Sequence, residues 1–306
     1  MKAAISDGVR SHVKRLARRT IFQAAERGWE LGFQLAGWLL RPSIERQMPS
    51  GSDCVLVVAP HPDDETLGCG GAIARHAEEG DRVCVFVVTD GSNSRAYGLK
   101  PAEMRRMRGM EAVRAVRALG PMDLVQLGLP EARWDPDDLQ QPLEALLRHD
   151  QPTLIYAPSC IDFHPEHVKV AQVLARTLVC LPDTARPKVR VYELQVPLTP
   201  ALADVAVEVG GLAAAKKARA FAEYRTQQGS LMRAVRHSRY LRRLYGSPGP
   251  LEVFWDLDTP GYCRLMEDGV QVPRRYRGMR PRPFTDGLAW LVGLRERRQL
   301  RKLVRG

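Results

Sequence analysis

The sequence predicts an α/β protein with a Rossmann-like, mostly parallel sheet flanked by helices. Short runs of Val, Ile and Leu alternate with longer helical patterns through the middle of the chain, which is typical of βαβ units. The short runs are continuously apolar rather than alternating, as expected for parallel strands that are buried on both faces. A dense charged cluster follows the first run, at the place where sheets of this class bind their ligands.

Five strands are expected where aliphatic residues run together, and helices are expected where apolar residues recur at helical spacing. The predicted strands are 54–59, 83–88, 123–129, 153–158 and 189–196. The predicted helices lie near 66–80, 101–119, 137–149, 166–180 and 211–227. Because strands and helices alternate along the chain, neighbouring strands should be joined by helical crossovers and lie parallel.

Charge divides the chain into three segments. The 306 residues carry a net charge of +11, of which 1–50 contributes +5, 257–306 contributes +7 and 51–256 contributes −1. We therefore expect a nearly neutral α/β domain over 51–256, with a basic helical extension on each side. The N-terminal extension should be helical over 10–41, and the C-terminal one over 284–304 after an extended stretch at 273–284.

The basic extensions have two interpretations. The N-terminal helix carries one apolar stripe, formed by Phe22, Trp29, Phe33 and Leu40. Such a stripe can pack on the domain, but its coincidence with basic residues favours attachment to an anionic membrane surface. Trp29, Trp38 and Trp290 would then lie at the headgroup level. Nucleic acid is not expected as a partner, because no recognised binding motif accompanies the arginines.

Cysteine usage and hydropathy indicate the compartment. The six cysteines form no CxxC pair, so we expect a reducing environment and no metal binding by cysteine. The most apolar N-terminal stretch, 29–40, contains Glu30 and Gln34 and is followed by no small-residue cleavage site. It is therefore neither a membrane span nor a signal peptide. The expected location is the cytoplasm, with membrane association through the basic ends.

The first chemical motif is 59-APHPDDETLGCGG-71. It places His61, Asp63 and Asp64 directly after a buried strand, where such dense charge is costly to desolvate unless a cation or substrate uses it. An imidazole and a carboxylate suit Zn²⁺, which in catalytic sites takes three protein ligands and one water. The glycines that follow lack the spacing of a dinucleotide-binding loop, and close packing of helix on sheet explains them better.

The second motif, 162-DFHPEHVKVA-171, also follows a strand and opens a helix. Pro165 fits the first helical turn, and His164 and His167 are three residues apart, so they can share one face. We expect the two motifs to converge at one edge of the sheet. Together they offer three metal ligands, a general base and a general acid. The residue types alone leave open which aspartate and which histidine of the two motifs bind the metal.

The first motif strongly resembles the signature of the LmbE/PIG-L zinc-dependent deacetylases, which remove the acetyl group from N-acetylglucosaminyl conjugates. The resemblance covers about 51–256 and continues in 88-VTDG-91, 127-LGLPE-131, 164-HPEH-167, 224-YRTQ-227 and 251-LEVF-254. It implies an LmbE-like deacetylase fold. By this resemblance, the zinc ligands are His61, Asp64 and His167. Asp63 would be the general base, and His164 the acid that also stabilises the oxyanion.

The family also has an Arg-x-x-Glu pair on a helix that ends in Leu-Gly. The matching residues are Arg108 and Glu111, before 119-LG-120, and the resemblance implies that Arg108 holds the substrate. The ligand set suits Zn²⁺ and also Fe²⁺. The family usually has aspartate where Glu131 and Glu166 stand; the longer Glu166 side chain can still orient an imidazole.

The predicted function is zinc-dependent removal of the N-acetyl group from an N-acetylglucosamine-type amino-sugar conjugate. A glycolipid or polysaccharide precursor is the expected conjugate, and the lipid interpretation rests only on the basic amphipathic ends. One alternative is a catalytically silent binding domain at a membrane, against which the intact Asp63 argues. Another is an amidohydrolase that uses the same zinc site on a non-sugar N-acyl substrate. His76, His149 and His237 have no partner motif and are expected at structural or exposed positions.

Overall fold

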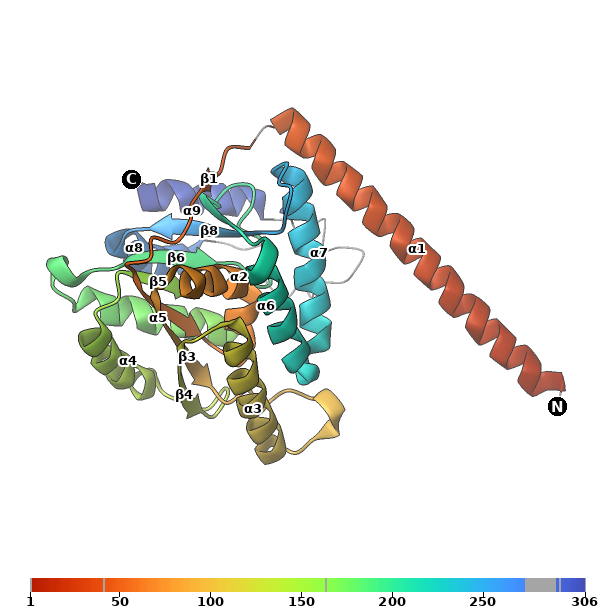
Figure 1. Ribbon diagram of the computed structural model, residues 1–306, viewed down its shortest axis with the longest axis horizontal. Coiled ribbons are helices and arrows are strands. Elements are labelled where there is room, and N and C mark those ends of the chain that lie inside the picture. The colour runs from red at the N-terminus through yellow and green to blue at the C-terminus, as the bar shows by residue number, and fades with distance from the viewer. Residues whose placement is uncertain (1, 41, 163, 273–289, 292, 306) are drawn as a thin grey trace.

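A mixed, mostly parallel sheet forms the centre of the molecule (Figure 1). The computed structural model describes residues 2–40, 42–162, 164–272, 290–291 and 293–305. Within them, eight strands follow the order β1-β7-β8-β6-β5-β2-β3-β4, and all neighbours pair in parallel except the two pairs that involve β8. The strands are β1 (Glu45–Arg46), β2 (Cys54–Ala59), β3 (Arg82–Thr89), β4 (Asp123–Leu129), β5 (Leu154–Ala157), β6 (Lys188–Tyr192), β7 (Val205–Glu208) and β8 (Leu251–Leu257). The predicted α/β class is confirmed.

Helices cover both faces of the sheet (Figure 1). One face carries α2 (Asp64–Glu79), α3 (Pro101–Leu119) and α6 (Gly211–Glu223). The other carries α4 (Pro136–Asp150), α5 (Pro165–Val179), α8 (Thr259–Glu267) and α9 (Leu294–Arg305). Two further helices, α1 (Lys2–Leu40) and α7 (Gln228–Leu244), pack on each other beside the sheet. Short 3₁₀ turns lie at Ala96–Gly98, Asp183–Ala185, Arg225–Gln227 and Gly269–Gln271.

The strand residues divide between two cores as the pleat requires. In β2, Val55 and Val57 pack under α2, α3 and α6, whereas Leu56 and Val58 pack under α4 and α5. Both sets are buried, because successive strand side chains point to opposite faces. This explains why the sequence runs are continuously apolar.

Local signals begin the crossover helices close to the predicted positions. Pro101, Pro136 and Pro165 each occupy the first turn of a helix, where the missing N–H is harmless and the fixed φ fits. Gly80 ends α2 with a φ of 93°, a conformation that favours glycine. The last predicted strand ends early, at Tyr192 rather than 196, because the chain turns away there and Glu193 accepts a hydrogen bond from the Leu198 amide.

The two ends of the chain contribute to the α/β body. β1 pairs with β7 at the edge of the sheet, so the sheet begins before residue 51. At the other end, α8 and α9 bury Tyr262, Leu265, Leu300 and Val304 in the core shared with α4 and α5. The packed unit therefore continues past 256. The stretch predicted to be extended, 273–284, lies outside the described residues.

Two residues of the apolar stripe predicted on the first helix, Trp29 and Phe33, pack on the protein, whereas Leu40 is exposed. Phe33 is buried, stacks on Tyr240 of α7 at 4.9 Å between ring centroids and meets Trp290 edge-on at 5.3 Å. Trp29 packs in the same cluster. The placement of all three tryptophans at a headgroup layer is therefore wrong: only Trp38 of the three is exposed, because α7 provides a partner for the stripe.

Candidate metal centre and substrate cavity

The two chemical motifs meet where the strand order reverses. From β2, the chain proceeds to β3 and β4 on one side and then to β5 and β6 on the other. Because β2 and β5 are parallel neighbours, with Val57 opposite Tyr156, their carboxyl ends lie together. His61 follows β2, and His167 stands on α5, which follows β5. The sequence expectation of convergence at one sheet edge agrees with this geometry.

Three polar side chains form a compact, buried triangle. His61 Nδ1 lies 3.2 Å from Asp64 Oδ2 and 3.1 Å from His167 Nε2. The third side, from His167 Nε2 to Asp64 Oδ2, is 3.3 Å. With metal–ligand bonds of about 2.0–2.2 Å, two donors of a tetrahedral site lie roughly 3.3–3.5 Å apart. The triangle therefore fits a small divalent ion with little adjustment.

His164 is a fourth donor beside this triangle. Its ring lies 4.7 Å from that of His61 and 4.8 Å from that of His167, centroid to centroid. One donor atom from each of the three histidines falls within 4.8 Å of the others. Burial lowers the pKa of His164 to about 4, helped by the charges of His61 and His167. Two ligand sets are thus geometrically available, and they differ in whether Asp64 or His164 completes them.

Asp162 supports the second histidine, a role that sequence reasoning missed. Its Oδ2 lies 3.1 Å from His167 Nδ1, and its Oδ1 accepts the His164 amide at 2.9 Å. A carboxylate on the far nitrogen of a ligand histidine fixes the ring and its tautomer. Asp162 stood within the second motif, but its position relative to an imidazole five residues later depends on the turn. Glu166, the residue that the sequence offered for orienting an imidazole, accepts the Trp134 indole N–H at 2.7 Å instead.

The electrostatics of the triangle favour a bound cation. Burial alone would raise the pKa of Asp64, but His167 and His61 hold it well below its usual value. Burial likewise opposes charge on His167, yet Asp64 and Asp162 raise its pKa well above the usual value. These carboxylates thus hold positive charge on an otherwise poorly solvated imidazole. A divalent ion would satisfy the same carboxylates while leaving the imidazoles neutral.

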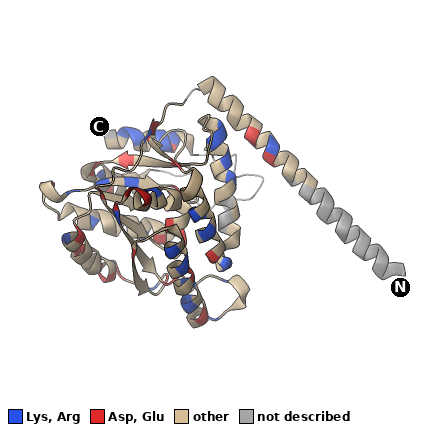
Figure 2. Cartoon of the chain, in the orientation of Figure 1, with Lys and Arg blue, Asp and Glu red and all other residues tan. Residues whose placement is uncertain are grey.

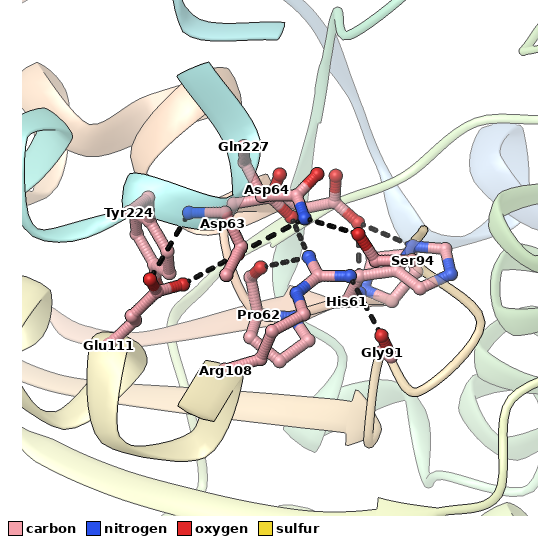
Figure 3. Close-up of polar contacts among 12 residues, drawn as sticks. His61, Pro62, Asp63, Asp64, Gly91, Ser94, Arg108, Glu111, Tyr224 and Gln227 are labelled. Atoms are coloured by element: carbon pink, nitrogen blue, oxygen red, sulfur yellow. Dashed lines mark hydrogen bonds and ion pairs between the residues drawn. The ribbon is translucent and has the colours of Figure 1, made fainter. Parts of the chain in front are cut away.

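Asp63 stands beside the triangle in a strained conformation (Figure 3). Its φ is 129°, a region that non-glycine residues rarely occupy and that is often found at functional sites. Arg108 Nη2 donates to Asp63 Oδ1 at 2.8 Å and to the Pro62 carbonyl, while Nη1 donates to the Gly91 carbonyl at 3.3 Å. Burial raises the pKa of Asp63 to about 7, against the opposing effect of Arg108.

Glu111, the second residue of the Arg-x-x-Glu pair, contacts the 224–227 turn and not Arg108. Glu111 accepts hydrogen bonds from the amide and the hydroxyl of Thr226, at 3.2 and 2.7 Å. It therefore holds the 224–227 turn against α3, one helical turn from Arg108 (Figure 3). In the same turn, the Tyr224 hydroxyl donates to Glu65 at 2.6 Å, and Glu65 accepts the Asp63 amide at 3.2 Å. These contacts tie the loop after β2 to the distant 224–227 turn.

Glu131 approaches the other nitrogen of His61. Its Oε1 lies 3.5 Å from His61 Nε2, and its Oε2 accepts the Asn93 amide at 3.0 Å. Burial would raise the pKa of Glu131, but the contact with His61 and the Asn93 amide hold it below the usual value. An ionised carboxylate here orients His61, as Asp162 orients His167. The longer side chain at this position thus still reaches the imidazole.

All six predicted site residues line one cavity of about 620 Å³, a volume typical of sites for small organic ligands. They are His61, Asp63, Asp64, Arg108, His164 and His167. The cavity brings the metal triangle, Asp63 and His164 to one space. Arg108 reaches the same space, but the residue is only 4% exposed and its guanidinium is held by Asp63 and backbone carbonyls.

Known proteins resemble the middle of this chain. Residues 56–178 match the family model described as PIG-L: GlcNAc-PI de-N-acetylase. The chain is 28% identical over 142 residues to a probable N-acetyl-alpha-D-glucosaminyl L-malate deacetylase 2 of Bacillus anthracis, covering 44% of this chain and 62% of that protein. It is 27% identical over 160 residues to a 1D-myo-inositol 2-acetamido-2-deoxy-alpha-D-glucopyranoside deacetylase of Kineococcus radiotolerans, covering 41% and 44%. The chain thus spans less than two thirds of each of these relatives.

A solved structure shares the fold. The N,N'-diacetylchitobiose deacetylase of Pyrococcus horikoshii aligns with a TM-score of 0.58 and 21% identity, covering 69% of this chain and 86% of that one. At this identity the likeness concerns the fold alone. Among the described residues, no helix has both the length and the apolar character needed to cross a membrane.

Proposed function

We propose that this chain, which belongs to the PIG-L/LmbE deacetylase family through residues 56–178, is a metal-dependent hydrolase that removes the N-acetyl group from an N-acetylglucosamine-type conjugate. The observation that carries the proposal is the triangle of His61 Nδ1, Asp64 Oδ2 and His167 Nε2, with sides of 3.1 to 3.3 Å. Asp63 and His164 line the same cavity. No purely structural role accounts for this set of buried donors.

The proposed ion is Zn²⁺, held by His61, Asp64 and His167, although Fe²⁺ suits the same donors. When bound, the ion would polarise the amide carbonyl and acidify a water. Asp162 and Glu131 support the two histidines from behind, at 3.1 and 3.5 Å. The ligand rings are therefore oriented by carboxylates in the manner usual for metal histidines.

Asp63 is proposed as the base that takes the proton of the attacking water. Its contact with Arg108 at 2.8 Å fixes the carboxylate and favours its ionised form. His164 lies beside His61 and His167, with ring centroids 4.7 and 4.8 Å away. It is proposed to donate a hydrogen bond to the oxyanion and a proton to the leaving amine. Arg108 positions Asp63; direct contact with the sugar stays a prediction.

Acetate release tests the proposal. The full chain, loaded with Zn²⁺, is incubated with N-acetylglucosaminides of varied aglycone and with N-acetyl amino acids. We expect acetate from the sugars, loss of activity with a chelator and recovery with Zn²⁺. Asp63→Asn should lower kcat by about 10²–10⁴-fold while retaining the metal. Release from N-acetyl amino acids alone would favour a non-sugar amidohydrolase, and bound metal without any hydrolysis would favour a silent binding domain.

We also propose that the chain attaches to an anionic membrane on its cytoplasmic side. The outward face of α1 exposes four apolar side chains, Leu31, Leu35, Trp38 and Leu39, each more than half exposed. The acidic residues of this part of α1 point to the body instead, with Glu26 3.7 Å from Arg236 and Glu30 3.5 Å from Arg243. Basic residues also cluster on α7 and α9 (Figure 2).

Charge selects a lipid surface over a second copy of the chain. Residues 1–50 carry a net charge of +5, so a symmetric contact through α1 would bring two basic segments together, whereas anionic lipid attracts them. Co-sedimentation with anionic vesicles should fall in Leu35→Ser/Trp38→Ser. The matched control is Met110→Ser, an exposed apolar residue of α3. Equal binding to neutral vesicles, or no effect of the double substitution, would contradict the proposal.

A further inference from the structure

The cavity extends well beyond the metal centre. From the ends of β2 and β5 it runs along the carboxyl edge of the sheet, past the 193–197 segment, to the end of β7 and the start of β8. Helices α6 and α7 cover it. We call its far part the distal arm, which is lined by Leu67, Val209, Ala214, Ala218, Phe221 and Val253. These side chains are all apolar, unlike those around the metal.

Charged groups that border the distal arm are paired within the protein. Glu252 accepts the amides of Gly71 and Ala72, each at 2.7 Å, and contacts Lys217. The Glu252 carboxylate is needed at this place because α2 is broken at Cys69, whose φ is −145°. The backbone amides after the break would otherwise lack a hydrogen-bond acceptor. Lys217 also donates to the Leu67 carbonyl at 3.4 Å. Neither charge is left over for a ligand.

The charged side chains on the opposite wall of the cavity are also paired within the protein. His237 Nε2 lies 2.5 Å from Glu193 Oε1, and Glu193 Oε2 accepts the Leu198 amide at 2.8 Å. At the metal end, by contrast, His164 Nδ1 and Arg108 Nε are buried without a hydrogen-bond partner among the described residues. The metal end of the cavity thus has polar atoms that a ligand could hydrogen-bond, whereas the distal arm offers mainly apolar side chains.

The distal arm reaches the surface between α6 and α7. Ala218 lines it and is exposed, and so is Val235, with 41% of its surface accessible. Met232, one turn earlier on α7, is 63% exposed. An occupant that filled the arm could therefore continue outward along apolar side chains.

We propose that the distal arm holds an alkyl chain of the sugar substrate, so that the enzyme acts on an amphiphilic glucosamine conjugate rather than on a polysaccharide. The proposal rests on the proposed function, since it uses the same cavity. A polysaccharide would bring hydroxyl groups to an apolar wall whose bordering charges are already paired, and would leave those hydroxyl groups without partners there. An alkyl chain gains about fourfold in affinity for each methylene removed from water, equivalent to ~0.8 kcal/mol. The chain could belong to the aglycone or replace the methyl of the acyl group.

Calorimetry with unreactive amines tests the proposal without turnover. The Zn²⁺-loaded full chain is titrated with methyl glucosaminide, octyl glucosaminide and methyl N-octylglucosaminide, none of which has an amide bond to cleave. We expect at least one octyl ligand to bind about tenfold or more tightly than the methyl compound. Preference for octyl glucosaminide assigns the chain to the aglycone, and preference for the N-octyl compound assigns it to the acyl side.

Substitutions on one helix localise the effect. Ala218→Phe should fill the distal arm, abolish the octyl preference and leave methyl glucosaminide binding unchanged. Ala215→Phe, on the exposed side of the same helix, should leave both unchanged, and Val235→Ser provides a second, milder change at the opening. Equal affinity for all three amines, or a preference that survives both arm substitutions, would overturn the proposal. Absence of acetate release together with a retained octyl preference would count against the proposed hydrolysis alone.

Discussion

His61 and His167 lie 106 positions apart in the chain, yet Nδ1 of the first is 3.1 Å from Nε2 of the second. Their meeting follows from the adjacency of β2 and β5, each of which delivers its motif to the same sheet edge. Two imidazole nitrogens at this distance repel each other unless a proton or a cation lies between them. The pair therefore provides the most direct test of the proposed metal.

We predict that His167→Ala loses stoichiometric Zn²⁺ and, with it, hydrolysis. The substitution removes a buried donor that also balances Asp64 and Asp162. His149→Ala is the matched control, because the His149 side chain is 83% exposed and contacts only its neighbour Asp150 among the interactions described. The zinc content of both variants after dialysis, measured by atomic emission, tests this prediction. Full zinc occupancy in His167→Ala would remove the basis of the proposed centre.

A second pair of substitutions separates the two available ligand sets. We predict that Asp64→Ala loses the metal, whereas His164→Ala keeps it and loses about 10²–10⁴-fold in kcat, as expected for removal of a general acid. Asp64 has the closer geometry, since its Oδ2 is within 3.3 Å of both other donors. The reverse outcome, with metal lost only in His164→Ala, would make the third ligand a histidine.

The carboxylate behind His167 is expected to tune metal affinity. We predict that Asp162→Asn weakens Zn²⁺ binding by about 10–100-fold, the usual effect of removing such a support. Glu166→Gln should leave affinity unchanged, because Glu166 contacts the Trp134 indole instead of an imidazole. Competition with a chromophoric chelator gives both constants. Similar losses in the two variants would mean that Asp162 has no special role.

Removal of the Arg108 guanidinium should lower the stability of the fold as well as the catalytic activity. Its guanidinium compensates the buried Asp63 carboxylate and two backbone carbonyls. Breaking a buried ion pair from one side costs about 3–5 kcal/mol, so Arg108→Met should lower the free energy of unfolding by that order. Arg106→Met, an exposed position on the same helix, is the control. Denaturant unfolding of both proteins provides the comparison, and equal stability would contradict the structural role.

His76 is expected to make stability fall in mild acid. Burial lowers its pKa although Asp81 lies 2.6 Å from Nδ1, and Tyr156 lies 3.0 Å from Nε2. Because the folded protein binds this proton less readily, the contribution is complete above the unfolded pKa of about 6.5 and is lost as pH falls below it. From about pH 7.5 to about pH 5.5, the wild type should lose more unfolding free energy than His76→Gln. Parallel pH profiles would exclude this linkage.

The sequence predicts local features well and distant contacts poorly. β2, β4 and α3 have the predicted bounds, because aliphatic runs and a leading proline act locally. β7 and α7 were not predicted, since β7 has four residues and lies between β1 and β8, far along the chain. The role of Asp162 depends on where α5 places His167, and no spacing rule supplies that distance.

The apolar stripe of α1 illustrates a limit of periodicity. A run that includes Trp29 and Phe33 is equally suited to a lipid surface and to another helix. Only the presence of Tyr240 on α7 shows that the protein itself takes this face. The opposite face, with Leu35 and Trp38 exposed, does not follow the pattern first noticed in the sequence.

Arg297 of α9 connects the carboxyl-terminal helix to the wall of the cavity. Its fully buried guanidinium donates to the Pro197 carbonyl at 2.7 Å, and Pro197 is part of the cavity wall. A shortened protein that stops at residue 256, the predicted end of the deacetylase domain, would lack this contact along with Leu300 and Val304. If such a fragment were inactive, the cause could be loss of cavity structure and not a wrong assignment of the site residues. Activity should therefore be assayed with the whole chain.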